Sequence, residues 1–254
     1  MENTGILNKV AQITLLFWLM KIVATTLGET FGDFISMTLN FGYLISLGIT
    51  AVVFAILLVI QLNSKKYIPY VYWLVIIATT TLGTEISDFI DRTLHLGYIG
   101  GSILLFTGLL LTLVLWKKKF KDVKVYPITN KNKELYYWMA ILFSNSLGTA
   151  FGDCLSDVMG LSYIQGALVT AFIIVVVVVV HYATKINEVL LFWLAFIFTR
   201  PFGATFGDFL TKPIHKGGLN LGTLNASVVA LVVIIILIYI EHKRHHKSLE
   251  TNTK

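Results

Sequence analysis

The chain has 254 residues, of which 56% are hydrophobic and only 13% are charged. A soluble domain of this length carries about 25% charged residues, so the composition excludes an ordinary soluble protein. The net charge of +6 comes from basic residues in short loops and in the C-terminal tail. This placement favours a membrane face, and not nucleic acid, as their partner. The single cysteine, Cys154, excludes an intrachain disulfide.

Long apolar runs separate the charged segments along the chain. In chain order, four of them cover residues 43–62, 98–116, 163–182 and 221–240. Each is about 20 residues long, which is the length of helix that crosses a bilayer core of roughly 30 Å. Strands of a membrane barrel would instead alternate with a period of two. The sequence therefore predicts an all-α membrane protein with about eight transmembrane helices.

One pattern of tryptophan, glycine and aspartate occurs four times. The tryptophan precedes the glycine by ten residues, and the aspartate follows the glycine by five. The tryptophans are Trp18, Trp73, Trp138 and Trp193, the glycines are Gly28, Gly83, Gly148 and Gly203, and the aspartates are Asp33, Asp88, Asp153 and Asp208. A turn and an apolar run follow each copy. We therefore expect four repeats, each made of a motif-bearing helix, a tight turn and a return helix.

The spacing of the repeats groups them in two pairs, because successive tryptophans are 55, 65 and 55 residues apart. We predict an N-terminal four-helix half at 1–116 (repeats 1 and 2) and a basic cytoplasmic linker at 117–133. A C-terminal four-helix half at 134–242 (repeats 3 and 4) and a basic cytoplasmic tail at 243–254 follow. Each unit crosses the membrane twice, so the repeats are parallel and the halves are pseudo-symmetric. All four aspartates should then lie at a similar depth.

The distribution of basic residues predicts the orientation. Fifteen lysines and arginines lie in the chain ends and in the loops between repeats, against three in the turns inside repeats. Because cytoplasmic loops carry the excess of positive charge, we expect both termini in the cytoplasm of a bacterium, with the protein spanning its plasma membrane several times. The aspartates then lie in the outer half of the membrane.

The acidic residues of the motifs are the candidate metal ligands. A carboxylate inside the bilayer costs several kcal/mol unless it is paired, protonated or hydrated, so it is a functional candidate. The predicted ligands are Asp33, Asp88, Asp153, Asp208, Glu29 and Glu85. Helical spacing places each glutamate on the same face as the aspartate of its repeat. Such oxygen donors suit magnesium, calcium, manganese or a proton. The alternative is that the aspartates are interfacial helix-end residues.

A polar stripe continues from the aspartates along the motif helices in steps of three or four residues. It consists of Thr25, Thr80, Thr84, Asn145 and Thr149, with Lys21, Arg200 and Asp91 as pathway or charge-balancing residues. The stripe is interpreted as a transport pathway or, alternatively, as a structural polar seam. The two deep basic residues occur in repeats 1 and 4 only, which breaks a four-fold arrangement and favours a carrier over a uniform pore.

The glycines of the motif have the small-xxx-small spacing that lets helix backbones approach closely. These predicted packing positions are Gly28, Gly32, Gly83, Gly148, Gly152, Gly203 and Gly207. Together with the tryptophan and aspartate register, they cover the chain from about residue 12 to residue 242. The pattern resembles a family of bacterial membrane proteins with four tandem two-helix repeats and unknown function. The resemblance implies this architecture; repeat 2 departs from it with Ser87 in place of a glycine.

These features predict a cation transporter. The specific hypothesis is export of a divalent metal such as manganese in exchange for protons, without enzymatic activity and without a resident cofactor. The alternatives are a cation channel with an acidic ring and a non-transporting structural or partner-binding membrane protein. The expected partners are the lipid bilayer and a metal cation or proton, with no nucleic acid, and a homo-oligomer is compatible with the sequence.

Overall fold

The computed structural model describes residues 8–252, which contain eight long helices and no strand. The motif-bearing helices are α2 (Leu15–Asp33), α4 (Pro69–Asp88), α6 (Lys131–Asp153) and α8 (Glu188–Thr211). The return helices are α3 (Gly42–Asn63), α5 (Gly97–Phe120), α7 (Tyr163–Ala183) and α9 (Thr223–Asn252). The predicted all-α architecture of four two-helix repeats is confirmed.

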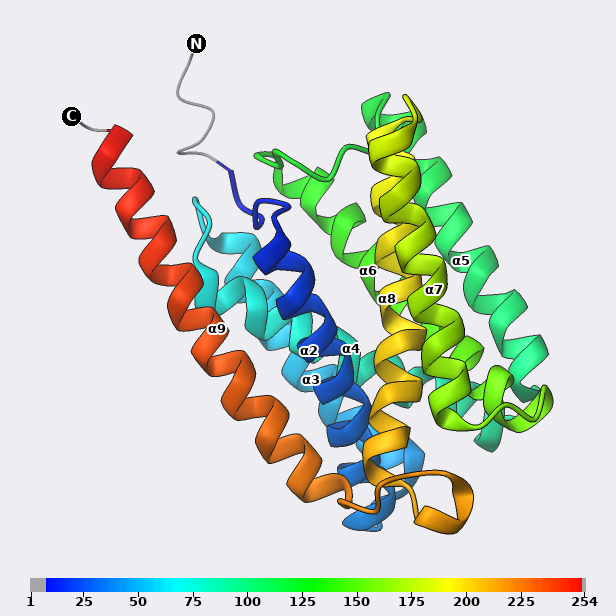
Figure 1. Cartoon of the computed structure of the whole chain (residues 1–254). Helices are drawn as coiled ribbons and strands as arrows, with labels where there is room; N and C mark the ends of the chain where they lie inside the picture. The colour runs from blue at the N-terminus through cyan, green and yellow to red at the C-terminus, as the bar shows by residue number, and fades with distance from the viewer. Residues whose placement is uncertain (1–7, 253–254) are drawn as a thin grey trace.

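The four motif helices form a closed ring at the centre of the molecule. α2 and α6 each pack against both α4 and α8. Each return helix packs outside the ring on the motif helix of the next repeat: α3 on α4, α5 on α6, α7 on α8 and α9 on α2. Figure 1 shows the last of these contacts, with α9 in orange and red beside α2 in blue. The repeats are thus joined in a cycle that returns from repeat 4 to repeat 1.

Of the eight long helices in residues 8–252, seven are long and apolar enough to cross a membrane by length and composition. The membrane-spanning windows of α3, α5, α7 and α9 are only 17% to 28% buried, whereas those of α2, α4 and α8 are 61% to 67% buried. The outer helices therefore expose apolar side chains, as lipid contact requires. The remaining helix, α6, is more polar because it carries Lys131, Lys133 and Glu134 in its first turn. It forms the fourth side of the ring.

The backbone changes geometry directly after the motif aspartate in repeats 1 to 3. The π-helical segments η1 (Phe34–Thr38), η2 (Phe89–Thr93) and η3 (Cys154–Val158) begin at the next residue. In repeat 4, α8 instead continues to Thr211, and a 3₁₀ turn, η4 (Ile214–Lys216), follows. π-helical turns occur often at functional sites. The aspartates of repeats 1 to 3 therefore lie where the α-helix ends, and Asp208 lies three residues before the end of α8.

Helices extend into both ends of the segment between the predicted halves. α5 continues to Phe120 and α6 begins at Lys131, so only residues 121–130 of the predicted linker 117–133 lie outside helices. The side chain of Asn130 caps α6 by accepting hydrogen bonds from Asn132 N and Lys133 N. α9 likewise continues as helix through residue 252 of the predicted tail. The division of the chain into two halves stays a prediction.

Candidate functional site

The four motif aspartates lie at one end of the ring, where the turns inside the repeats are. We call this the turn end, and the opposite end, where α2 begins and α9 ends, the terminal end (Figure 1). Asp33, Asp88, Asp153 and Asp208 are all buried, with exposed fractions of 2%, 1%, 5% and 6%. Buried charges are stable only when they are paired or hydrogen-bonded.

Two basic side chains bridge these aspartates in pairs. Arg92 Nη2 donates a hydrogen bond to Asp153 Oδ2 at 3.0 Å, and its Nε lies 3.3 Å from Asp88 Oδ1. Arg92 follows Asp88 of its own repeat by four residues and reaches Asp153 of the next repeat; the second base, Lys212, is related to Asp208 and Asp33 in the same way. We call the first arrangement the Arg92 pair; it joins α4 to α6.

The second arrangement, the Lys212 pair, joins α8 to α2. Lys212 Nζ donates a hydrogen bond to Asp33 Oδ2 at 2.7 Å and lies 3.1 Å from Asp208 Oδ1. The residue lies just beyond the end of α8. Burial acts to lower the pKa of Lys212, but the carboxylates of Asp208 and Asp33 outweigh burial and raise it. Lys212 is therefore a cation throughout the physiological pH range.

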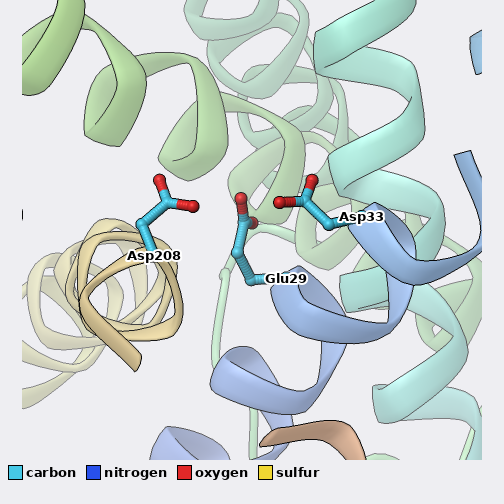
Figure 2. Close-up of side chains that lie close together, drawn as sticks. All are labelled: Glu29, Asp33 and Asp208. Carbon is cyan, nitrogen blue, oxygen red and sulfur yellow. The ribbon is translucent and has the colours of Figure 1, made fainter. Parts of the chain in front are cut away.

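A third carboxylate lies beside the Lys212 pair. Oxygen atoms of Glu29, Asp33 and Asp208 all lie within 4.8 Å of one another. Figure 2 shows the three side chains pointing toward one another, two from α2 and one from α8. Arg200 Nη2 donates hydrogen bonds to Glu29 Oε2 at 2.9 Å and to Thr84 Oγ1 at 2.6 Å. We call Glu29, Asp33 and Asp208 the carboxylate cluster; it offers hard oxygen ligands to one ion.

Further from the turn end, two basic side chains cross between opposite helices of the ring. Lys21 on α2 donates to Asn145 Oδ1 on α6 at 2.8 Å, and Arg200 on α8 reaches Thr84 on α4. Both bases are 0% exposed. Arg200 thus pairs with a carboxylate. Lys21 forms no ion pair within residues 8–252, and its Nζ lies 4.0 Å from the ring centroid of Phe196.

The threonines of the predicted stripe are buried and bond to backbone. Thr25, Thr80 and Thr84 each donate to a carbonyl of an adjacent ring helix, at 3.0 to 3.3 Å. Thr149 donates within its own helix to Asn145 O at 3.5 Å. In this conformation these hydroxyl groups hold the ring helices together.

The motif glycines lie where neighbouring ring helices touch. A β-carbon on the first glycine of each motif would meet a side chain of the next repeat: Gly28 would meet Thr80, Gly83 would meet Asn145, Gly148 would meet Arg200 and Gly203 would meet Thr25. Gly32, Gly152 and Gly207 approach the neighbouring helix one turn further on. A side chain at these positions would push the ring helices apart.

A cavity of about 380 Å³ opens beside the carboxylate cluster at the turn end. Its wall contains the three cluster residues together with Asp153 and Lys212. The other lining residues are Met37, Arg92, Tyr98, Ser156, Asp157, Tyr163 and Lys216. The structure thus brings four of the six predicted ligands to one cavity: Glu29, Asp33, Asp153 and Asp208.

The remaining predicted acids lie away from the cavity lining. Asp88 contacts the bridging base of its pair. Glu85 is 0% exposed, lies against Gly32 of α2, and has no hydrogen-bond partner for either carboxyl oxygen in the described chain. Asp91 faces α5, where a β-carbon on Gly101 would overlap its carboxylate. These three residues are therefore not positioned as ligands of the same ion.

A family model described as Repeat of Unknown Function (DUF347) matches residues 16–67, 71–120, 136–187 and 191–246. The chain belongs to this family. Each DUF347 match covers one motif helix and the return helix that follows, so the four tandem repeats and the resemblance derived from the sequence are confirmed. No curated protein and no solved structure matches the chain.

Within the DUF347 repeats, the residue four positions after the motif aspartate differs in charge from copy to copy. These residues are Met37, Arg92, Asp157 and Lys212. Sequence reasoning placed Arg92 and Lys212 among the charges of interfacial turns and missed their role in the site. The available signal was their spacing of four from an aspartate, which puts base and acid on one helix face. Their reach to the next DUF347 repeat required the structure.

Aromatic side chains close the terminal end of the ring. The tryptophan of each DUF347 repeat follows another aromatic residue, and rings from neighbouring repeats contact each other. The ring centroids of Phe17 and Trp73 are 5.6 Å apart, and those of Tyr72 and Trp138 are 5.4 Å apart. The tryptophans of repeats 2 to 4 are buried. The repeated tryptophan therefore belongs to the packed core.

A buried ion pair lies at the terminal end beside the aromatic layer. Lys9, in the segment before α2, pairs with Glu134 of α6, and Gln61 Nε2 donates to the same carboxylate at 2.7 Å. Lys9 and Glu134 are 4% and 0% exposed. Sequence reasoning counted Lys9 as a loop charge and did not single out Glu134, because neither belongs to the repeated motif.

Proposed function

We propose that this protein is a carrier that exports a cation, specifically a divalent metal such as manganese, in exchange for protons. The observation that carries the proposal is the carboxylate cluster, whose three buried residues have oxygen atoms within 4.8 Å of one another. Carboxylate oxygens are preferred ligands of hard divalent cations. Buried acids in membrane helices are costly, which favours a functional reason for them.

The distribution of charge supports an orientation of the protein in the membrane. Basic residues gather in the loops of the terminal end, which supports a cytoplasmic location for that end in a bacterial plasma membrane. The cavity at the turn end then faces the outside. In an exporter, this conformation is the one from which the ion leaves. Export is the direction that we propose.

A carrier agrees with the interior better than a channel. The side chains of Lys21 and Arg200 cross the ring, and the aromatic layer covers its terminal end. A channel would need a continuous polar path or a wettable constriction. The conformation described here is therefore interpreted as open at the turn end only. Transport then requires a second conformation that opens toward the terminal end.

Proton exchange is a natural partner reaction for such a site. When a cation leaves, its carboxylate ligands need another positive charge, because unpaired charges are costly inside a membrane. Protons from the outside can supply that charge during the return step. The exchange therefore needs no residue outside the cavity.

The test is transport by the purified full-length protein in proteoliposomes. Flux of Mn²⁺, Mg²⁺, Ca²⁺ and Zn²⁺ would be measured with and without a pH gradient. Asp33→Asn removes a cluster ligand, and Asp91→Asn removes a buried carboxylate outside the cavity as the matched control. We expect saturable manganese flux that depends on the pH gradient, survives in Asp91→Asn and is lost in Asp33→Asn.

Other results would select the alternatives. Flux that does not saturate and ignores the pH gradient would identify a channel. Absence of flux for every ion, with both variants as stable as the parent, would contradict transport of these metals. A structural or partner-binding role would then be preferred.

The cavity supports a second candidate cargo, a small organic cation. Its volume of about 380 Å³ greatly exceeds the roughly 30 Å³ that one water molecule occupies in the liquid. Tyr98 and Tyr163 line it, and aromatic rings attract organic ammonium groups. Competition of methylammonium or putrescine with manganese flux would distinguish the two: inhibition at low concentration favours the organic cation.

A further inference from the structure

In repeats 2 and 4, the residue four positions after the motif aspartate places a base between two aspartates, but the two bases are held differently. Arg92 Nη1 donates a hydrogen bond to Tyr43 Oη at 2.9 Å, and its guanidinium lies 5.7 Å and 5.8 Å from the ring centroids of Tyr43 and Tyr98. The Lys212 ammonium has only Asp33 and Asp208 as partners within the described chain. Arg92 is therefore fixed by four residues and Lys212 by two.

The surroundings of Lys212 leave it room to move. It follows the last residue of α8, and its side chain is 23% exposed. Lys212 lines the 380 Å³ cavity, whose lining also includes Asp153 and Asp157. A lysine ammonium sits on a flexible four-carbon stem, whereas a guanidinium is a rigid fork. The ammonium can thus leave the aspartates and still meet a carboxylate.

The Lys212 ammonium is the cation that holds these two aspartates. It lies 2.7 Å from Asp33 Oδ2 and 3.1 Å from Asp208 Oδ1, so it occupies the space between two of the three carboxylates of the cluster. Asp33, Asp208 and Lys212 together carry one uncompensated negative charge. A divalent ion in place of the ammonium would neutralise both aspartates.

We propose that Lys212 is a tethered counter-cation. Its ammonium occupies the metal subsite when no metal is bound, and the transported divalent ion displaces the ammonium into the cavity. This inference rests on the function proposed above and adds a specificity device to it. A monovalent ion gains nothing over the ammonium, because it replaces one positive charge with another. A divalent ion adds a charge. Lys212 therefore selects divalent over monovalent cations and weakens the affinity for both.

Competition by a tethered group has a measurable consequence. The apparent dissociation constant of the ion equals the intrinsic one divided by the fraction of protein in which the subsite is free. If the ammonium occupies the subsite for about nine tenths of the time, its removal strengthens ion binding by about tenfold. A nearby positive charge that does not occupy the subsite acts only through its screened field, so its removal would strengthen binding much less.

The experiment measures Mn²⁺ binding to the purified full-length protein in detergent, from the electron paramagnetic resonance signal of free Mn²⁺. The variants are Lys212→Met, Lys212→Gln and Asp33→Asn, with Lys216→Met as matched control. Lys216 lines the same cavity but forms no ion pair within residues 8–252. Thermal unfolding of each variant checks that it is folded. Sodium and potassium are added as monovalent competitors.

We expect Lys212→Met and Lys212→Gln to bind Mn²⁺ about tenfold more tightly and to become sensitive to sodium. Lys216→Met should stay within about twofold of the parent, because only long-range charge is lost. If the parent binds Mn²⁺, Asp33→Asn does not, and the Lys212 variants bind no more tightly, the tethered cation is refuted while the proposed function stands. If neither parent nor variants bind any metal, both are refuted.

Discussion

The Arg92 pair and the Lys212 pair are built from equivalent positions of the repeat and yet differ in almost every contact. Both place a base one turn after its own aspartate and against the aspartate of the next repeat. The Arg92 pair includes a tyrosine hydroxyl that accepts a hydrogen bond. The Lys212 pair has Glu29 beside it, and three carboxylates converge there. The Arg92 pair resembles a fixed structural ion pair between two helices, and the Lys212 pair resembles a binding site.

This difference shows how a four-fold repeat can produce a single site. A ring with four identical aspartates would offer four equal positions to a cation. Arginine at one interface fills two of them with a rigid, always charged group. Lysine at the opposite interface fills the other two with a group that can be displaced. The repeat supplies the scaffold, and the residue four positions after each aspartate decides its use.

The largest expected effect is the loss of stability when the Arg92 pair is broken. Arg92→Met leaves Asp88 and Asp153 buried without their cation, and breaking such a pair costs about 3 kcal/mol. We expect a clear fall in the thermal unfolding temperature in detergent. Lys212→Met should lower it less, because the cavity can hydrate both Asp33 and Asp208, whereas Asp88 of the Arg92 pair does not line it.

A compensating variant distinguishes the stability lost through unpaired charges from the stability lost through side-chain packing. Arg92→Met combined with Asp88→Asn and Asp153→Asn removes the unpaired charges and should recover part of the lost stability. Equal losses in Arg92→Met and Lys212→Met would remove the distinction between the two pairs.

The second prediction compares the aspartates of the two pairs in ion binding. Asp33→Asn removes a ligand of the carboxylate cluster and should weaken Mn²⁺ binding by about a hundredfold, which corresponds to about 2.7 kcal/mol. Asp88→Asn removes a carboxylate that does not line the cavity and should weaken binding by less than about threefold. Isothermal titration calorimetry with both variants measures the contrast. A larger loss in Asp88→Asn would move the site to the α4–α6 interface.

The third prediction concerns a substitution that gives the Lys212 pair the same type of base as the Arg92 pair. Lys212→Arg places a rigid fork between Asp33 and Asp208, where it can bond to both carboxylates. We expect Mn²⁺ binding weaker than in the parent by up to about tenfold, with stability equal or higher. The same titration, together with the thermal unfolding temperature, measures both effects. Unchanged affinity would indicate that the group at this position does not compete with the ion.

The sequence predicted the repeats well because each copy repeats one pattern. The tryptophan, glycine and aspartate register located all four motif helices, and apolar length located the return helices. It could not show that each return helix packs on the next repeat, because that contact joins residues far apart in the chain. The same limit hid the Lys9–Glu134 pair, whose members are separated by 125 positions.

The candidate site was predictable in composition but not in arrangement. The motif aspartates and Glu29 were identified from their helical spacing. Equal depth suggested that all four aspartates share one site, whereas the bases divide them into two pairs. Glu85 lies on the face of α4 that packs against α2, which spacing within α4 alone could not establish. The interface that a helix face meets is a property of the fold.

The smallest expected effect is on an exposed ion pair, which serves as a reference for the Arg92 pair and the Lys212 pair. Asp122 and Lys133 form an ion pair at 2.7 Å between the loop after α5 and the first turn of α6, with the Asp122 side chain 39% exposed. Asp122→Asn should cost less than about 1 kcal/mol, because water screens such a pair. The loss should shrink further at high salt.

The pH dependence of this reference pair has a definite sign. Slight burial acts to raise the pKa of Asp122, but hydrogen bonds from Lys133 and from the backbone of Lys124 outweigh burial and lower it from the ordinary value of 3.8. Its small contribution is therefore complete above that value and is lost as the pH falls below it. Unfolding of Asp122→Asn and the parent should thus differ at pH 7 and converge in acid. A loss as large as that of Arg92→Met would mean that the buried location of the Arg92 pair is not what makes it strong.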